Sequence, residues 1–133
     1  MSIIIGADIV PVESNYELFS QSRVNELIGP ELSDILCRAD YRIFNLETCL
    51  KDRRQPIRKY GPHLAAPTAT AAGLKSMGID LITLANNHIM DQDAQGLSST
   101  IHKLDEAGIS HLGAGENLNE AQQPFYFEIK EKE

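Results

Sequence analysis

The sequence has no tryptophan, only two cysteines and no long apolar run. A transmembrane helix needs about 18 or more consecutive apolar residues, and no window of this chain reaches that length, so we expect no transmembrane segment. The opening MSIIIGADIV has a short apolar run without basic residues before it, which predicts a strand and not a signal peptide. The expected location is therefore the cytoplasm.

The two cysteines, Cys37 and Cys49, do not have the spacing of a metal site or a redox motif. In a chain without an export signal, such cysteines are normally reduced. We expect two free, mostly buried thiols and no disulfide.

Basic residues are in the minority, with 12 Lys and Arg against 19 Asp and Glu, a formal net charge of -7 and a pI near 5.0. Nucleic acids and anionic membranes are bound by concentrated basic surface, so neither is an expected partner. The exception is KDRRQPIRKYG, residues 51–61. This cluster is either a solvated loop or a clamp for phosphate or a polyanion beside a site.

The chain does have the length and apolar content for one core, with 133 residues of which 42% are hydrophobic. A domain of this size buries roughly two-thirds of its unfolded surface. Short apolar strand patterns alternate with helical patterns, which predicts an α/β fold with a mostly parallel sheet, flanking helices and right-handed crossovers. The expected strands are residues 2–10, 41–47, 79–85, 109–112 and a fifth that begins at 124; the expected helices are a short helix or turn after residue 14, then 30–39, 66–78 and 93–108.

The first strand is a continuous apolar run, as expected of a strand that is covered on both faces. Gly78 and Gly108 predict left-handed helix ends. Thr68 is a candidate helix N-cap, and Asp91 and Asp93 are expected to cap the helix that follows them.

Polar residues gather where the predicted strands end. They are Asp8 after the first, Asn45 and Glu47 after the second, Asn86, Asn87 and His88 after the third, and residues 113–116 after the fourth. Ligands of open parallel sheets bind outside the carboxyl ends of the strands. If the first three strands are neighbours, two carboxylates, three amides and an imidazole lie together at the edge formed by the carboxyl ends of the strands, here called the rim.

This donor set suits a divalent metal such as Mn, Zn or Fe, and two such ions can orient a water for attack on phosphorus. The imidazole could instead protonate a leaving group or stabilise charge. Each of these residues could also have a purely structural role. Asp8 could form a turn or cap a helix, and Glu47 could simply be solvated at the strand end. Asn86 and Asn87 could occupy a turn with positive φ, and His88 could be a structural histidine whose hydrogen bonds are satisfied. The glycines of GAGEN lack a dinucleotide fingerprint, and we expect them to let the turn pass close to another loop.

The ordered motifs GADIV, NLET, GIDLITLANNHIMD and AGISHLGAG resemble the bacterial capsule-synthesis, or poly-gamma-glutamate biosynthesis, family (CapA-type), whose fold is similar to calcineurin-like metallophosphoesterases. The resemblance implies that Asp8 and Glu47 are acidic metal ligands, that Asn87 is an amide ligand and that His88 is the catalytic histidine near the scissile bond. It implies one or two divalent ions, Mn, Zn or Fe. Asn86 would shape the turn, and Asp91 matches an acidic residue of the family.

The chain also departs from the family pattern. Ala7 separates a glycine and an aspartate that are adjacent in the family, and DQD stands where the family has aspartate, an aromatic residue and glycine. The later half of family members adds strands and the histidine ligands of a glycine-histidine-x-histidine motif, which these residues lack. Residues 1–133 would thus be the N-terminal half of an α/β/β/α sandwich.

Two functions follow. The first is a metal-dependent phosphoesterase-like domain that acts on a phosphate-containing or anionic small molecule or polymer, with low or no hydrolytic activity by itself. The alternative is a non-catalytic α/β binding module that forms homo-oligomers through an exposed sheet edge.

Overall fold

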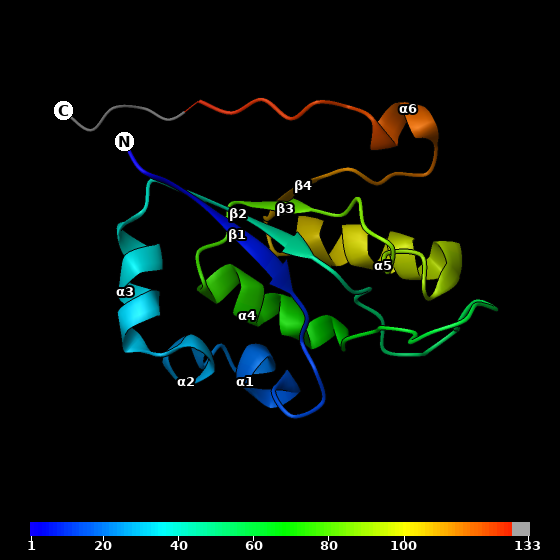
Figure 1. Ribbon diagram of the computed structural model, residues 1–133, viewed down its shortest axis with the longest axis horizontal. Coiled ribbons are helices and arrows are strands. Elements are labelled where there is room, and N and C mark those ends of the chain that lie inside the picture. Colours follow the sequence, from blue (N-terminus) through cyan, green and yellow to red (C-terminus); the bar gives the residue numbers. More distant parts are fainter. Residues whose placement is uncertain (129–133) are drawn as a thin grey trace.

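A computed structural model of the chain describes residues 1–128. Its centre is a sheet of four strands: β1 (Ile3–Ile9), β2 (Tyr41–Leu46), β3 (Leu81–Thr83) and β4 (Ser110–Leu112). The strands lie in the order β1-β2-β3-β4, and each neighbouring pair is parallel (Figure 1). This confirms the α/β class and the parallel sheet.

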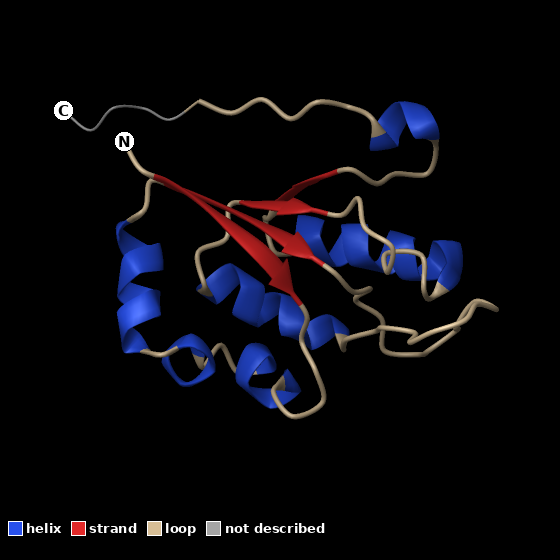
Figure 2. Cartoon of the chain, viewed as in Figure 1, coloured by secondary structure: helices blue, strands red, loops and turns tan. Residues whose placement is uncertain are grey.

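Helices connect the strands. They are α1 (Tyr16–Ser20), α2 (Val24–Ile28) and α3 (Pro30–Arg38) before β2, the 3-10 turn η1 (Thr68–Thr70) and α4 (Ala71–Ser76) before β3, α5 (Asp93–Glu106) before β4, and α6 (Leu118–Ala121) after it. A sheet whose strands follow one another in chain order, with right-handed crossovers, has all its connecting helices on one face. Figure 2 shows this arrangement, with α1 to α5 on one side of the sheet and residues 122–128 on the other.

The helix-covered face holds the apolar core, which includes the fully buried side chains of Leu46, Leu74, Ile82, Leu84 and Leu104. The opposite face is open along β1, where the side chains of Ile3 and Ile5 are 42% and 76% exposed. The prediction that the first strand is covered on both faces is therefore wrong, because the sequential strand order leaves no helix for this side.

The helix ends agree with the sequence in part. Gly78 and Gly108 have φ of +75° and +66°, which confirms the two left-handed stops. Thr68 is not an N-cap, since its hydroxyl donates to Oδ2 of Asp52 at 2.8 Å. The helix after it begins instead through a 3-10 turn at η1.

The expected fifth strand is not formed by residues 124–128, and the rest of it lies outside the described residues. These residues cross the open face, where the ring of Phe127 stacks on Tyr41 with centroids 3.9 Å apart. Residues 124–128 therefore contact the sheet through stacked rings and are not paired with it as a strand. Cys37 and Cys49 are both free, but only Cys49 is buried, because Cys37 lies on the outer side of α3. Among residues 1–128, no helix is long and apolar enough to cross a membrane.

Candidate active site

A chain of hydrogen bonds joins the ends of three neighbouring strands. The amide Nδ2 of Asn45 donates to Oδ1 of Asp8 at 2.8 Å, and the hydroxyl of Thr83 donates to Oδ1 of Asn45 at 3.0 Å. The strands are neighbours, as predicted, so Asp8 and Asn45 meet at one rim of the sheet.

Asp8 owes its position to an irregularity in β1. Ile5 pairs with Ile43 and Asp8 pairs with Asn45, so three steps along β1 match two steps along β2. A β-bulge of this kind absorbs one residue and re-aims the side chains that follow it. The extra residue turns Asp8 to the same face as Asn45, whereas strict alternation would place it on the helix-covered face.

Asn86 ties the turn after β3 to the end of β2. Its Nδ2 donates to the carbonyl of Leu46 at 2.9 Å and to Oδ1 of Asn45 at 3.2 Å. Its own Oδ1 accepts the backbone N–H of His88 at 3.0 Å. Asn86 therefore shapes the turn, as predicted, and it fixes the backbone that carries His88. The expectation of positive φ at Asn86 or Asn87 is wrong, because hydrogen bonds of the Asn86 side chain hold the turn instead.

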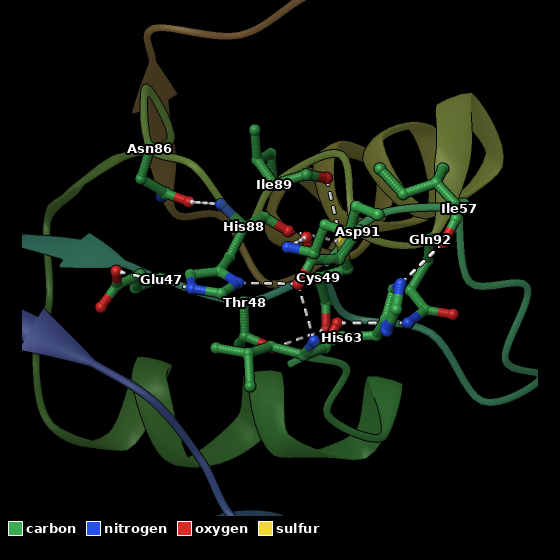
Figure 3. A network of polar contacts seen from close by, with 12 residues as sticks. Glu47, Thr48, Cys49, Ile57, His63, Asn86, His88, Ile89, Asp91 and Gln92 are labelled. Atoms are coloured by element: carbon green, nitrogen blue, oxygen red, sulfur yellow. Dashed lines mark hydrogen bonds and ion pairs between the residues drawn. The ribbon is translucent and has the colours of Figure 1, made fainter. Parts of the chain in front are cut away.

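The imidazole of His88 lies between two carboxylates (Figure 3). Its Nδ1 is 2.7 Å from Oδ2 of Asp91, and its Nε2 is 4.0 Å from Oε1 of Glu47. Because Nδ1 faces a carboxylate, it carries the proton of the neutral ring. Nε2 is then the atom that is left free for chemistry at the rim.

Asp91 is fully buried and all of its partners are polar. Besides His88, its carboxylate accepts Nζ of Lys59 and the backbone N–H of Leu64, the latter at 2.7 Å. Burial alone would raise the pKa of this carboxyl, but the hydrogen bonds from Lys59, His88 and Leu64 outweigh burial and hold the pKa below its usual range. Asp91 is thus a buried anion that orients His88.

The prediction that Asp91 caps the following helix is wrong. Its side chain is directed into the network around His88, and the N-cap position of α5 belongs to Gln92. Asp93 does lie in the first turn of α5, where Oδ1 accepts the N–H of Ala94 at 2.8 Å.

Buried groups also contact the turn that carries His88. The thiol of Cys49 faces the carbonyls of Ile89 and His88 at 2.9 and 3.3 Å, and burial raises its pKa, so it stays protonated. Gly113 lies against the same strand end. A Cβ atom at Gly113 would be 2.8 Å from Cβ of Ala85, which confirms that a glycine of GAGEN allows close passage of another loop.

The donor chemistry of the proposed metal ligands fits a borderline divalent ion, since Asp8 and Glu47 offer carboxylate oxygens and Asn87 an amide oxygen. Asp8 and Asn87 are exposed, and Glu47 is partly exposed. Within residues 1–128, however, no three His, Cys, Asp or Glu side chains converge closely enough to form a cation site by themselves. The metal-ligand roles stay predictions.

Sequence reasoning missed two members of this network. It gave Asp91 a helix-capping role and treated Lys59 only as part of the basic cluster. The signal for Asp91 was its spacing of three residues from His88, which brings both side chains to one side of a turn. Lys59 gave no such signal, because its partner lies 32 residues away.

The sequence profile of the family described as "Bacterial capsule synthesis protein PGA_cap" matches residues 2–133. Curated relatives include the capsule biosynthesis protein CapA of Bacillus anthracis, 38% identical over 99 residues, which cover 71% of this chain and 24% of that protein. The PGA biosynthesis protein CapA of Bacillus subtilis (strain 168) is 28% identical over 115 residues, covering 84% of this chain and 30% of that protein. An uncharacterized protein of Sinorhizobium fredii, y4sH, is 36% identical over 97 residues, covering 68% and 21%. The chain therefore spans between about a fifth and a third of the length of these relatives.

Proposed function

Because this chain belongs to the bacterial capsule synthesis protein family, we propose that it contributes part of a metal-dependent phosphoesterase site, with His88 as the catalytic residue. The observation that supports this most is the position of His88, whose Nδ1 is held by buried Asp91 while Nε2 faces Glu47 at the rim. At 4.0 Å from Oε1 of Glu47, Nε2 lies beyond hydrogen-bond length, which leaves this nitrogen able to exchange a proton with a substrate.

In this proposal each residue has one task. Asp91 holds the Nδ1 proton of His88, and Nε2 takes a proton from water and delivers it to the leaving oxygen of a phosphoester. Asp8, Glu47 and Asn87 would hold the ion, and a divalent ion (Mn, Zn or Fe) would supply Lewis acidity and charge neutralisation when bound. The substrate class is a phosphate-containing or otherwise anionic molecule, and the hydrolysis by residues 1–133 alone is expected to be slow.

The first test measures metal binding, which does not depend on turnover. Isothermal titration with Mn²⁺ or Zn²⁺ should give an affinity that falls about ten-fold or more in Glu47→Ala, a loss at least as large as that seen when partners of metal ligands are removed. The matched control is Glu116→Ala, an exposed carboxylate in the turn after β4. Equal affinities in all three proteins would contradict the ligand assignment.

The second test measures hydrolysis of bis(4-nitrophenyl) phosphate with Mn²⁺, Zn²⁺ or Fe²⁺. His88→Ala should lower kcat by about 100-fold or more, the usual contribution of a positioned acid or base. The control is His102→Ala, since His102 is exposed and, among residues 1–128, pairs only with Glu106 on α5, at 3.0 Å. A His88→Ala variant that turns over as fast as the His102→Ala variant would rule out the catalytic role.

One observation favours the alternative function, an oligomeric module. β1 is an edge strand of the sheet, and Ile5 on it is 76% exposed. Exposed apolar edges pair readily with a second copy. Sedimentation velocity should then detect a dimer that Ile5→Lys converts to a monomer, and a wild-type monomer at high concentration would exclude this alternative.

A further inference from the structure

A cavity of about 810 Å³ lies between α5 and the segment that follows β4, which includes α6 (Figure 1). α5 and the turn before it contribute Met90, Leu97 and Ile101, and the segment after β4 contributes Gly115 and Glu120. A second cavity of about 310 Å³ shares Ile101, Gly115 and Glu120 with the first, so the two adjoin. They are called the α5 groove here. The volume of the larger cavity falls within the roughly 300 to 1,000 Å³ that is typical of small-molecule sites.

The α5 side of the groove is apolar and reaches solvent. Met90 is 42% exposed, and Leu97 and Ile101 are only partly buried. Leu97 and Ile101 are four residues apart, so their side chains lie on the same face of α5. An exposed apolar surface that is bordered by polar groups is typical of a site that binds a ligand.

Glu120 provides a negative charge on the other side of the groove. Its Oε2 accepts the N–H of Glu116 at 2.9 Å, and its Oε1 accepts Nδ2 of Asn117 at 3.0 Å. The side chain of Asn117 in turn accepts the N–H of Glu120 at 3.1 Å, and reciprocal bonds of this kind fix the first turn of a helix. Both partners of the carboxylate are neutral, and among residues 1–128 no Lys or Arg lines either cavity. The charge of Glu120 is therefore held in place without a counter-ion.

Gly115 holds the turn after β4 close to α6. A Cβ atom at residue 115 would lie 2.4 Å from Cβ of Glu120, which is too short for two carbon atoms, so no larger residue fits without displacing α6. The close passage and the hydrogen bonds of Glu120 form this side of the groove before a ligand arrives. A preformed site lowers the ordering cost of binding.

We propose that the α5 groove binds an amphipathic organic cation, a molecule with an ammonium group on an aromatic or alkyl body. Each oxygen of the Glu120 carboxylate uses one of its two lone pairs within the chain, so the ammonium group can donate to the others. The apolar body of the ligand covers Met90, Leu97 and Ile101 and removes their exposed surface from water. The groove shares no residue with the proposed catalytic centre, so this site does not depend on the proposed function.

Methionine methyl signals give a direct test, because the chain has three methionines and, within residues 1–128, Met90 alone lines the groove. Residues 1–133 with ¹³C-labelled methionine methyl groups are titrated with 4-phenylbutylammonium chloride and followed by NMR. The Met90 signal, assigned through its loss in Met90→Leu, should shift saturably with a Kd in the millimolar range or tighter. The signal of Met77, which is buried in the core, should not move. A Met90 signal that stays in place would overturn the proposal.

Ser98→Phe tests the position of the ligand. Ser98 is exposed on α5 and lines the larger cavity, so a phenyl ring there occupies the space of the ligand and should raise Kd about ten-fold or more. The control is His102→Phe, which places the same ring one turn further along α5 and outside the groove, and its Kd should stay within two-fold of wild type. Equal Kd values in the two variants would contradict binding in the groove.

The charge of the ligand tests the role of Glu120. The neutral 4-phenylbutanol should bind about two- to five-fold more weakly than the ammonium compound, the range for an exposed charge pair, and the anionic 4-phenylbutyrate should bind more weakly still. Glu120→Gln should abolish the preference for ammonium over alcohol, whereas Glu31→Gln, an exposed site on α3, should preserve it. The ratio of the two Kd values stays informative even if Glu120→Gln loosens α6. A wild-type protein without this preference, or a Glu120→Gln variant that keeps it, would overturn the assignment of a cation site.

Discussion

Nδ1 of His88 lies 2.7 Å from Oδ2 of Asp91, three residues further along the chain. Asp91 is fully buried, and its two oxygens also accept Lys59 and the N–H of Leu64. One carboxylate therefore fixes the orientation of an imidazole and the position of a loop. The first two predictions follow from this pair.

Asp91→Asn should destabilise the protein by about 1.5 to 3 kcal/mol, the range for losing hydrogen bonds to a charged group. The amide keeps the size of the side chain but cannot accept from all three donors. Urea unfolding measures the difference. Asp93→Asn is the control, because Asp93 is exposed and, within the described part of the chain, its oxygen accepts only the neighbouring Ala94 N–H; its effect should stay within about 0.5 kcal/mol. Equal stabilities of the two variants would contradict a structural role for the Asp91 charge.

Low pH should remove the stabilisation that the ionised Asp91 carboxylate provides. Since the pKa of Asp91 is lower in the folded than in the unfolded chain, its stabilisation is complete above the unfolded pKa of about 3.9 and is lost as the pH falls through the folded pKa. The difference in the free energy of unfolding between wild type and Asp91→Asn should be constant from pH 7 to 5. It should then shrink below pH 4. A difference that grows on acidification would have the wrong sign.

Gly113→Ala should destabilise the protein by about 2 to 4 kcal/mol. Gly113 has φ of +87°, which costs an L-residue about 1 to 2 kcal/mol, and its new Cβ would lie 2.8 Å from Cβ of Ala85, which adds an overpacking cost of about 1 to 3 kcal/mol. Gly61→Ala separates the two terms, since Gly61 has φ of +94° but open space around it. Thermal or urea unfolding should show the smaller loss for Gly61→Ala, and equal losses would mean that the contact with Ala85 carries no energy.

Thr100→Val should cost about 1 to 3 kcal/mol. The buried Thr100 hydroxyl accepts the N–H of Leu50 at 2.8 Å and donates to the carbonyl of Gly96 at 2.7 Å. Valine has the same shape but leaves the Leu50 N–H without its acceptor. Thr100→Ser keeps the hydroxyl and should retain most of the stability. A Thr100→Val variant as stable as wild type would contradict the contribution of this hydrogen bond.

The sequence predicted the elements whose cause is local. The four strands follow from apolar runs, and the helix ends at Gly78 and Gly108 follow from the freedom of glycine at positive φ. The rim was predictable too, because the carboxyl ends of parallel strands meet wherever the strands are neighbours.

What escaped prediction depends on contacts between distant segments. The pairing of Lys59 with Asp91 joins residues 32 positions apart through a loop without periodicity. The open face of β1 reflects the order of strands in the sheet, which no pattern within residues 2–10 reveals. Likewise, the sequence of residues 124–128 resembles a strand and does not predict that Phe127 stacks on Tyr41 across the open face.

Because β1 contains a bulge, the number of residues in this strand does not by itself determine which face its last side chains are on. Inserting or deleting one residue in a paired strand normally turns a whole set of side chains to the opposite face. Here the step from Ile5 to Asp8 contains one residue more than the matching step from Ile43 to Asn45, so the chain accommodates Ala7 and still brings Asp8 opposite Asn45. The direction of the Asp8 carboxylate is therefore set by the irregularity between Ile5 and Asp8 and not by the number of residues in β1.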